Sequence, residues 1–229
     1  MLDELRAEVL EANLELVRRG LVIYTFGNAS GVSRELGLLA IKPSGVPYDK
    51  MTPDDMVITD LQGNIVEGTL RPSSDLATHA ALYRAYPSIG GVVHTHSRHA
   101  TAWAQALREI PCFGTTHADY FHGPVPVTEA LTAAEIAGDY EANTGMAILR
   151  RMQGLDPLGC PACLVAGHGP FCWGKSVTDA AHTAVIVEEL AAMAWITMTI
   201  NPHAQPISQP LRDKHHFRKH GPSATYGQN

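Results

Sequence analysis

The chain is organised around Gly90–His99, which reads Gly-Gly-Val-Val-His-Thr-His-Ser-Arg-His. Its first half is apolar and β-branched, which predicts a buried strand over Gly91–Thr95. Alternate residues of a strand point to the same side, so His94 and His96 share a face, with Cα atoms roughly 6–7 Å apart. Two imidazoles placed in this way can reach one metal ion. Taken alone, the pair is equally compatible with an ordinary strand end.

Two further candidate ligands lie elsewhere in the chain. His168 follows an apolar run, predicted as a strand over Cys163–Ala166, and it stands between two glycines that leave its ring unobstructed. Asp75 lies at a predicted helix start. Three imidazole nitrogens and one carboxylate suit Zn²⁺ better than Mg²⁺ or Ca²⁺, which prefer oxygen ligands. With these additions, a metal site becomes the favoured interpretation.

Helices and short strands alternate on both sides of this stretch. Helices are predicted over 2–19, from Ser73–Asp75 to before Pro87, over Arg98–Leu107, from Thr132 to about Arg151, and over Val177–Thr199. Further strands are predicted over Leu21–Thr25, Leu38–Ile41, Val57–Asp60 and Asn64–Glu67, with a short one around Phe171. The early strands are joined by turns, which predicts a single α/β domain over 1–200, with three α/β/α layers and a largely antiparallel sheet. Residues 201–229 form a polar C-terminal arm without hydrophobic periodicity.

The composition narrows the class of protein. The 229 residues carry a net charge of −6, which removes the global electrostatic reason to bind nucleic acid or anionic lipid. The longest mostly apolar run, Leu190–Ile200, is short for a membrane span, and the acidic start is unlike a secretory signal. A cytoplasmic protein is expected. Cys160 and Cys163 have the spacing of a redox or zinc pair, but no second pair follows, so buried thiols beside a strand are favoured.

Three short segments combine the groups that bind phosphate. Gly27–Ser30, Lys42–Gly45 and Ser73–Ser74 supply small residues, hydroxyls, turn N–H groups and a single lysine. Neither GxxxxGK[ST] nor GxGxxG is present, so this is not a nucleotide-binding loop of a known kind.

Two groups of side chains could transfer protons. Thr115–Tyr120 places Asp119 among polar residues, and the arm carries His215 and Tyr226. A disordered end is the usual state of such a terminus. No GxSxG motif is present, so a serine hydrolase is not supported.

Taken together, the motifs resemble the zinc-dependent class II aldolase and epimerase family, which acts on sugar phosphates. The resemblance covers nearly the whole chain and is carried by Gly27–Ser30, Lys42–Gly45, Arg71–Asp75, Val93–His99, Gly114–Tyr120, Gly167–Phe171, Asp213–His215, Arg218–Gly221 and Tyr226–Gln228. It implies the class II aldolase fold, a small sugar-phosphate substrate and a homotetramer with active sites between subunits.

The resemblance also implies roles for individual residues. Asp75, His94, His96 and His168 would hold one Zn²⁺ per subunit, while Asn28, Lys42, Ser44, Gly45, Ser73 and Ser74 would hold the phosphate. Asp119 and Tyr226 would be the acid/base pair, donated by a neighbouring subunit, so that the arm completes the site. Thr115, Glu141 and His215 fall at positions that the family associates with its active site.

Three functions remain open at this point. Asp75, where the family's aldolases usually carry glutamate, and the arm favour epimerisation at C4 of a 2-ketopentose 5-phosphate. The alternative within the family is an aldolase acting on a deoxyketose 1-phosphate. A non-catalytic zinc module would use the same four ligands, but it would not need the phosphate-binding segments or Asp119.

Overall fold

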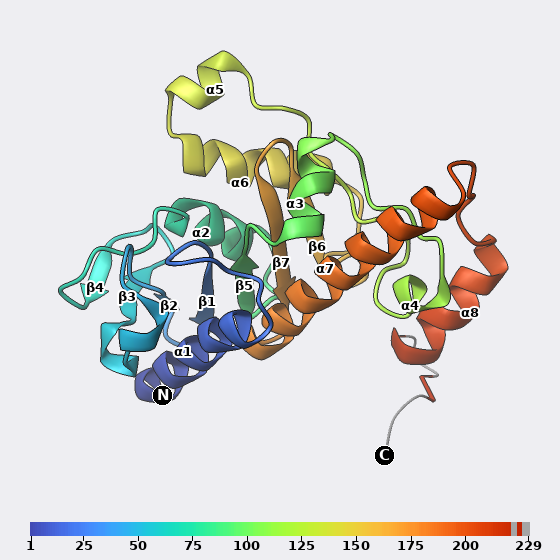
Figure 1. The fold of residues 1–229 in the computed structure, drawn as a ribbon. Coiled ribbons are helices and arrows are strands. Elements are labelled where there is room, and N and C mark those ends of the chain that lie inside the picture. Colours follow the sequence, from blue (N-terminus) through green and yellow to red (C-terminus); the bar gives the residue numbers. More distant parts are fainter. Residues whose placement is uncertain (221–223, 226–229) are drawn as a thin grey trace.

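The computed structural model describes residues 1–220 and 224–225 and contains a seven-stranded sheet with the order β4-β3-β2-β1-β5-β7-β6 (Figure 1). Every neighbouring pair of strands is antiparallel, as predicted. The strands are β1 (Asn28–Ser33), β2 (Leu38–Ile41), β3 (Val57–Asp60), β4 (Ile65–Glu67), β5 (Gly91–His94), β6 (Ala162–Val165) and β7 (Gly169–Gly174). The strand that carries the first histidine of the pair, β5, therefore lies inside the sheet, between β1 and β7.

Helices cover both faces of the sheet, and neighbouring residues of β1 show which helix lies on which side. Ser30 hydrogen-bonds His79 and Tyr83 of α2 (Leu76–Ala85), which packs with α6 (Tyr140–Arg151). Gly31 points the opposite way, and a Cβ there would lie 3.0 Å from Leu5 of α1 (Leu2–Arg18). The third layer is completed on that side by α7 (Val177–Ile200), and α3 (Arg98–Gln105) packs on α7. The predicted three-layer arrangement is confirmed.

The start of α7 sits directly on β5. A Cβ at Gly91 would lie 2.3 Å from Cα of Val177, so only glycine permits this approach. Within the described part of the chain, α7 is the one helix that is long and apolar enough to cross a membrane. Its packing across β5 and β7 buries Val187, Ala191 and their neighbours, but only 28% of the apolar window of α7 is buried.

Two predictions for local structure were wrong. Leu21–Thr25 is a loop, because Tyr24 adopts a left-handed φ of +54° and the strand begins only at Asn28. The helix predicted from Thr132 is divided at Gly138 into α5 (Ala133–Ala137) and α6, although the capping box at Thr132 is present. The arm, for which no secondary structure was predicted, contains a helix, α8 (Gln209–His220), which packs on the short α4 (Thr115–Ala118). The remaining elements are the 3₁₀ turns η1 (Tyr48–Lys50) and η2 (Pro53–Asp55).

Candidate metal and anion-binding site

Three histidines converge at one end of the central strands. His94 ends β5, His96 follows two residues later, and His168 lies in the turn between β6 and β7. Because His94 pairs with Phe171 in the β5–β7 ladder, the turn that precedes β7 reaches the same end of the sheet. One ligand nitrogen from each ring lies within 4.8 Å of the others, and the Nε2 atoms of His94 and His96 are 3.0 Å apart. This group could hold a metal ion.

The surroundings of these rings favour the neutral, metal-binding form of imidazole. Nδ1–H of His94 donates to the carbonyl of Pro170 at 3.0 Å, which leaves the lone pair on Nε2, beside His96. Burial lowers the pKa of His94 to about 3 and also lowers the pKa of His96 and of His168. Nδ1 of His168 is 3.3 Å from the hydroxyl of Tyr140. Partners of this kind on the second ring nitrogen are typical of metal-binding histidines.

Asp75 lies beside the histidines, as the candidate fourth ligand. It is the residue immediately before α2, and its carboxylate accepts a hydrogen bond of 2.7 Å from the side-chain amide of Asn28. Asn28 is paired with His94 in the β1–β5 ladder, which explains how the start of α2 meets the end of β5. Burial alone would raise the pKa of Asp75, but His94, His79 and the Asn28 amide lower it overall. Asp75 is therefore an anion available to a metal ion.

The predicted phosphate-binding segments open onto the same cavity, which has a volume of about 380 Å³. Two backbone hydrogen bonds hold the segments side by side: Ser44 N–H to the carbonyl of Arg71, and Ser73 N–H to the carbonyl of Lys42. The cavity is lined by all four candidate metal ligands, by all six predicted phosphate-binding residues and by Glu141. The structure therefore brings together Asn28, Lys42, Ser44, Gly45, Ser73, Ser74, Asp75, His94, His96, Glu141 and His168.

Lys42 supplies the positive charge of this cavity. The residue is 2% exposed, its ammonium is 3.2 Å from the carbonyl of Pro43, and it lies 4.8 Å from the centre of the Tyr48 ring. Burial lowers the pKa of Lys42 to about 8, so the side chain is still mostly charged at neutral pH. A partly desolvated ammonium gains a strong interaction when an anion binds to it.

The other predicted site residues lie elsewhere in the described structure. Thr115 begins α4, Asp119 follows its end, and His215 on α8 contacts the Asp119 carboxylate at 3.0 Å. None of these three residues lines the cavity that contains the histidines, and Figure 1 shows α4 and α8 beyond the C-terminal half of α7. Tyr226 lies outside the described residues.

Two features of the site were missed by sequence reasoning. Tyr140, which contacts His168, gave no signal except its position next to Glu141. His79 is fully buried one turn after Asp75, where its Nδ1 bonds Ser30 and its Nε2 has no hydrogen-bond partner.

The four cysteines are buried free thiols, and burial raises the pKa of the Cys160 thiol to about 12.

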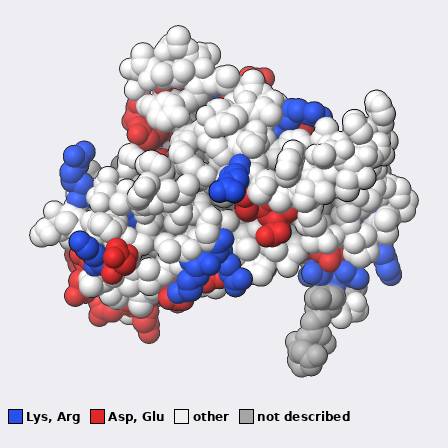
Figure 2. Space-filling view, viewed as in Figure 1, with Lys and Arg blue, Asp and Glu red and all other residues white. Residues whose placement is uncertain are grey.

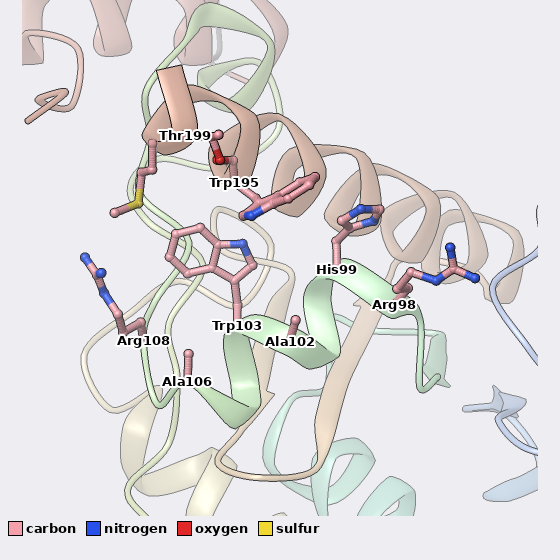
Figure 3. Close-up of a pocket in the computed structure, with 9 residues that line it drawn as sticks. Arg98, His99, Ala102, Trp103, Ala106, Arg108, Trp195 and Thr199 are labelled. Carbon is pink, nitrogen blue, oxygen red and sulfur yellow. The ribbon is translucent and has the colours of Figure 1, made fainter. Parts of the chain in front are cut away.

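A second, apolar cavity of about 490 Å³ lies between α3 and α7 (Figure 3). Trp103 and Trp195 face each other across it, and His99 and Arg98 line one end. It contains none of the predicted metal ligands or phosphate-binding residues. Its apolar walls suit packing against another surface better than proton transfer or phosphate binding.

Comparisons with known proteins agree with this geometry. Residues 7–195 match the family model described as Class II Aldolase and Adducin N-terminal domain. The chain is 56% identical over 227 residues to L-ribulose-5-phosphate 4-epimerase UlaF of Salmonella paratyphi B, which covers 99% of this chain and 100% of the relative. Among solved structures, an L-fuculose 1-phosphate aldolase has a TM-score of 0.79 at 25% identity, covering 93% of this chain and 94% of that protein. YgbL of Klebsiella pneumoniae, titled a putative aldolase/epimerase/decarboxylase, has a TM-score of 0.77 at 25% identity, covering 94% and 99%.

Proposed function

The chain belongs to the class II aldolase and adducin family, and on this basis we propose that it is an L-ribulose-5-phosphate 4-epimerase. Such an isomerase interconverts L-ribulose 5-phosphate and D-xylulose 5-phosphate. One observation carries the proposal: three histidines and Asp75 share a cavity with Lys42 in a chain 56% identical, along nearly its whole length, to a relative named for this reaction. The alternative, an aldolase of the L-fuculose 1-phosphate type, rests on 25% identity.

The chemistry of the reaction accounts for the groups in the cavity. C4 of a 2-ketopentose lies β to the carbonyl carbon, so its hydrogen is not acidic and enolisation cannot invert it. Deprotonation of the C4 hydroxyl allows the C3–C4 bond to break, and its electron pair passes to the ketone fragment as an enediolate. Rotation of the aldehyde fragment and addition to its other face then re-forms the bond with inverted C4. The enzyme must therefore stabilise negative charge and retain the aldehyde.

The histidines and Asp75 fit a metal ion that supplies this stabilisation. His94, His96, His168 and Asp75 would hold one Zn²⁺ per subunit, because three imidazole nitrogens and a carboxylate form a donor set that zinc accepts readily. A bound metal ion acts as a Lewis acid and stabilises negative charge on substrate oxygens, a role worth several kcal/mol.

The phosphate-binding segments hold the other end of the substrate. Lys42 offers an ammonium, and Ser44, Ser73 and Ser74 offer hydroxyl and backbone N–H donors around the same cavity. A phosphate held by these groups keeps the aldehyde fragment in place while it rotates. Retention of the fragment is the step at which an epimerase differs from an aldolase, which releases it.

Proton transfer needs a group on each face of the aldehyde, and we assign it to Asp119 and Tyr226. Asp119 does not line the cavity of its own chain, which supports the proposal that a neighbouring copy supplies it in a homotetramer with shared sites. Apolar surface supports association: Trp195 is 56% exposed and Ile200 80% exposed on α7. Figure 2 shows few charged side chains over this end of α7, and the cavity in Figure 3 opens beside it. A cytoplasmic location is part of the proposal and agrees with the four free thiols.

Incubation with L-ribulose 5-phosphate tests the function directly. Protein loaded with Zn²⁺ should form D-xylulose 5-phosphate, measured by a coupled assay or by NMR. Accumulation of two- and three-carbon fragments would indicate an aldolase instead. Absence of turnover with either pentulose phosphate, in protein that retains its metal, would contradict the proposal.

A further inference from the structure

The carboxylate of Asp119 is held by three basic side chains from one face of α8. Nη2 of Arg218 lies 3.1 Å from Oδ1 and 3.0 Å from Oδ2, Nδ1 of His215 lies 3.0 Å from Oδ1, and Nζ of Lys219 lies 3.4 Å from Oδ2. Residues three and four apart in a helix share a face, which explains why all three reach the same carboxylate. The side chain of Asp119 is only 13% exposed, so these contacts cover most of it.

Arg218 differs from the other two in contacting both carboxylate oxygens. A single nitrogen, Nη2, makes both contacts, and because it lies almost equally far from the two oxygens it restrains rotation of the carboxylate as well as attracting it. Arg218 is 36% exposed, and Lys219 also lies over the Tyr120 ring, 4.9 Å from its centre.

We propose that Arg218 is a positioning residue for Asp119: it holds the carboxylate in one orientation and keeps it ready to accept a proton from the substrate hydroxyl. Lys219 contributes to the same charge at longer range. In this step the carboxylate takes the C4 hydroxyl proton as the C3–C4 bond breaks. When the bond re-forms on the other face of the aldehyde, the second group, Tyr226, gives a proton to the new C4 oxygen, and the two groups then regain their starting protonation by exchange with water. The inference rests on the proposed function, in which Asp119 transfers protons in a neighbouring subunit's site.

The electrostatics agree with this role. Burial would raise the pKa of Asp119, but the hydrogen bonds from Arg218 and His215 and the charge of Lys219 lower it overall. Other titratable groups also face this region: His220 bonds the Asp119 backbone carbonyl, His182 on α7 reaches Tyr120, and His117 lies on α4 itself. Arg218 and Lys219 are the two contacts of the Asp119 carboxylate that are not imidazoles, so their removal separates their effect from that of the histidines.

The test is the pH dependence of kcat/KM for L-ribulose 5-phosphate in the metal-loaded protein. When catalysis needs an ionised base, kcat/KM falls as the pH drops through the pKa of that base. This low-pH fall is the acidic limb of the pH profile, and Arg218→Met should move it upward by about one pH unit. At pH values below the acidic limb of the wild type, kcat/KM of the variant should be about tenfold lower than that of the wild type, in addition to any change at neutral pH. Lys219→Met should give a smaller movement in the same direction. Arg218→Lys keeps the charge, but its ammonium is one bond closer to the backbone than Nη2, so it should no longer lie level with both oxygens of Asp119. This variant should leave the acidic side of the pH profile in place and lower kcat.

Lys214→Met is the matched control, because Lys214 is an exposed lysine on the same helix and is not among the α8 side chains that contact the Asp119 carboxylate. It should leave the limb where it is. The inference is overturned if the acidic limb of kcat/KM stays in place both in folded Arg218→Met and in Lys219→Met. If Arg218→Met does not fold, the result for Lys219→Met alone decides. Asp119→Asn distinguishes failure of the proposed function from failure of this inference. If Asp119→Asn is fully active, Asp119 has no part in the proposed function. If Asp119→Asn is inactive but the pH profiles of Arg218→Met and Lys219→Met do not move, only the role of Arg218 is refuted.

Discussion

Replacement of Lys42 by methionine should stabilise the protein while weakening its hold on substrate. The side chain is almost fully buried, and burial lowers its pKa from 10.5 to about 8. That difference corresponds to about 3 kcal/mol of unfavourable free energy for a charged Lys42 in the folded protein at pH 7. Methionine has a similar length and carries no charge, so it removes this cost. The two carbonyls near Nζ, at 3.2 and 3.4 Å, lose only long hydrogen bonds.

The expected gain is about 1–3 kcal/mol in the free energy of unfolding of the substrate-free protein, or about 2–4 °C in Tm per kcal/mol. Its pH dependence has a definite sign. Between pH 8 and 10.5 the unfolded chain binds the Lys42 proton more tightly than the folded chain, so this group makes the wild type more stable as pH rises. The advantage of Lys42→Met should therefore be full at pH 7 and fade as pH rises towards 10.5. Urea unfolding at several pH values measures it.

Substrate binding should change in the opposite direction. A hydrogen bond to a charged group contributes about 1.5–3 kcal/mol, so KM for L-ribulose 5-phosphate should rise about 10- to 150-fold in Lys42→Met. In the wild type KM should also rise above about pH 8, where the ammonium is lost, and this dependence should be absent from the variant. Lys50→Met is the control, because Lys50 is an exposed lysine nearby in the sequence. A variant that is less stable than the wild type, with an unchanged KM, would refute the reasoning.

Four further outcomes are expected. His168→Ala should lose bound metal and activity together, and full metal occupancy in this variant would contradict the ligand assignment. Tyr140→Phe should weaken metal affinity about 10- to 100-fold in a chelator competition, because Tyr140 contacts the second nitrogen of His168. Epimerisation in D₂O should place no deuterium at C4, and its detection there by NMR would exclude carbon–carbon cleavage. Inactive Tyr226→Phe and inactive His96→Asn subunits should regain part of the activity when co-refolded, whereas proven hybrids that stay inactive would rule out sites shared between chains.

Local sequence patterns were sufficient for much of the fold and for the core of the site. The β-branched run before His94 predicts a strand whatever it pairs with, and the two-residue repeat of a strand places His94 and His96 on one side. The glycines beside His168 and the polar residues around Asp75 are also local signals, because each can be recognised from a few neighbouring residues in the sequence. The pattern was insufficient where backbone conformation depends on one residue, as in the left-handed turn at Tyr24 or the break at Gly138.

Only the tertiary structure decided which of these segments meet. The β1–β5 pairing brings Asn28 to His94 and thereby to Asp75, and the β5–β7 pairing brings the turn with His168 to the same end of the sheet. The helix in the arm is also a tertiary effect: α8 has few apolar residues, and its contacts with Asp119 and α4 hold it in place. Spacing along the chain sets which way a side chain points, whereas contacts between residues many positions apart depend on strand register and helix packing, which short-range patterns do not contain.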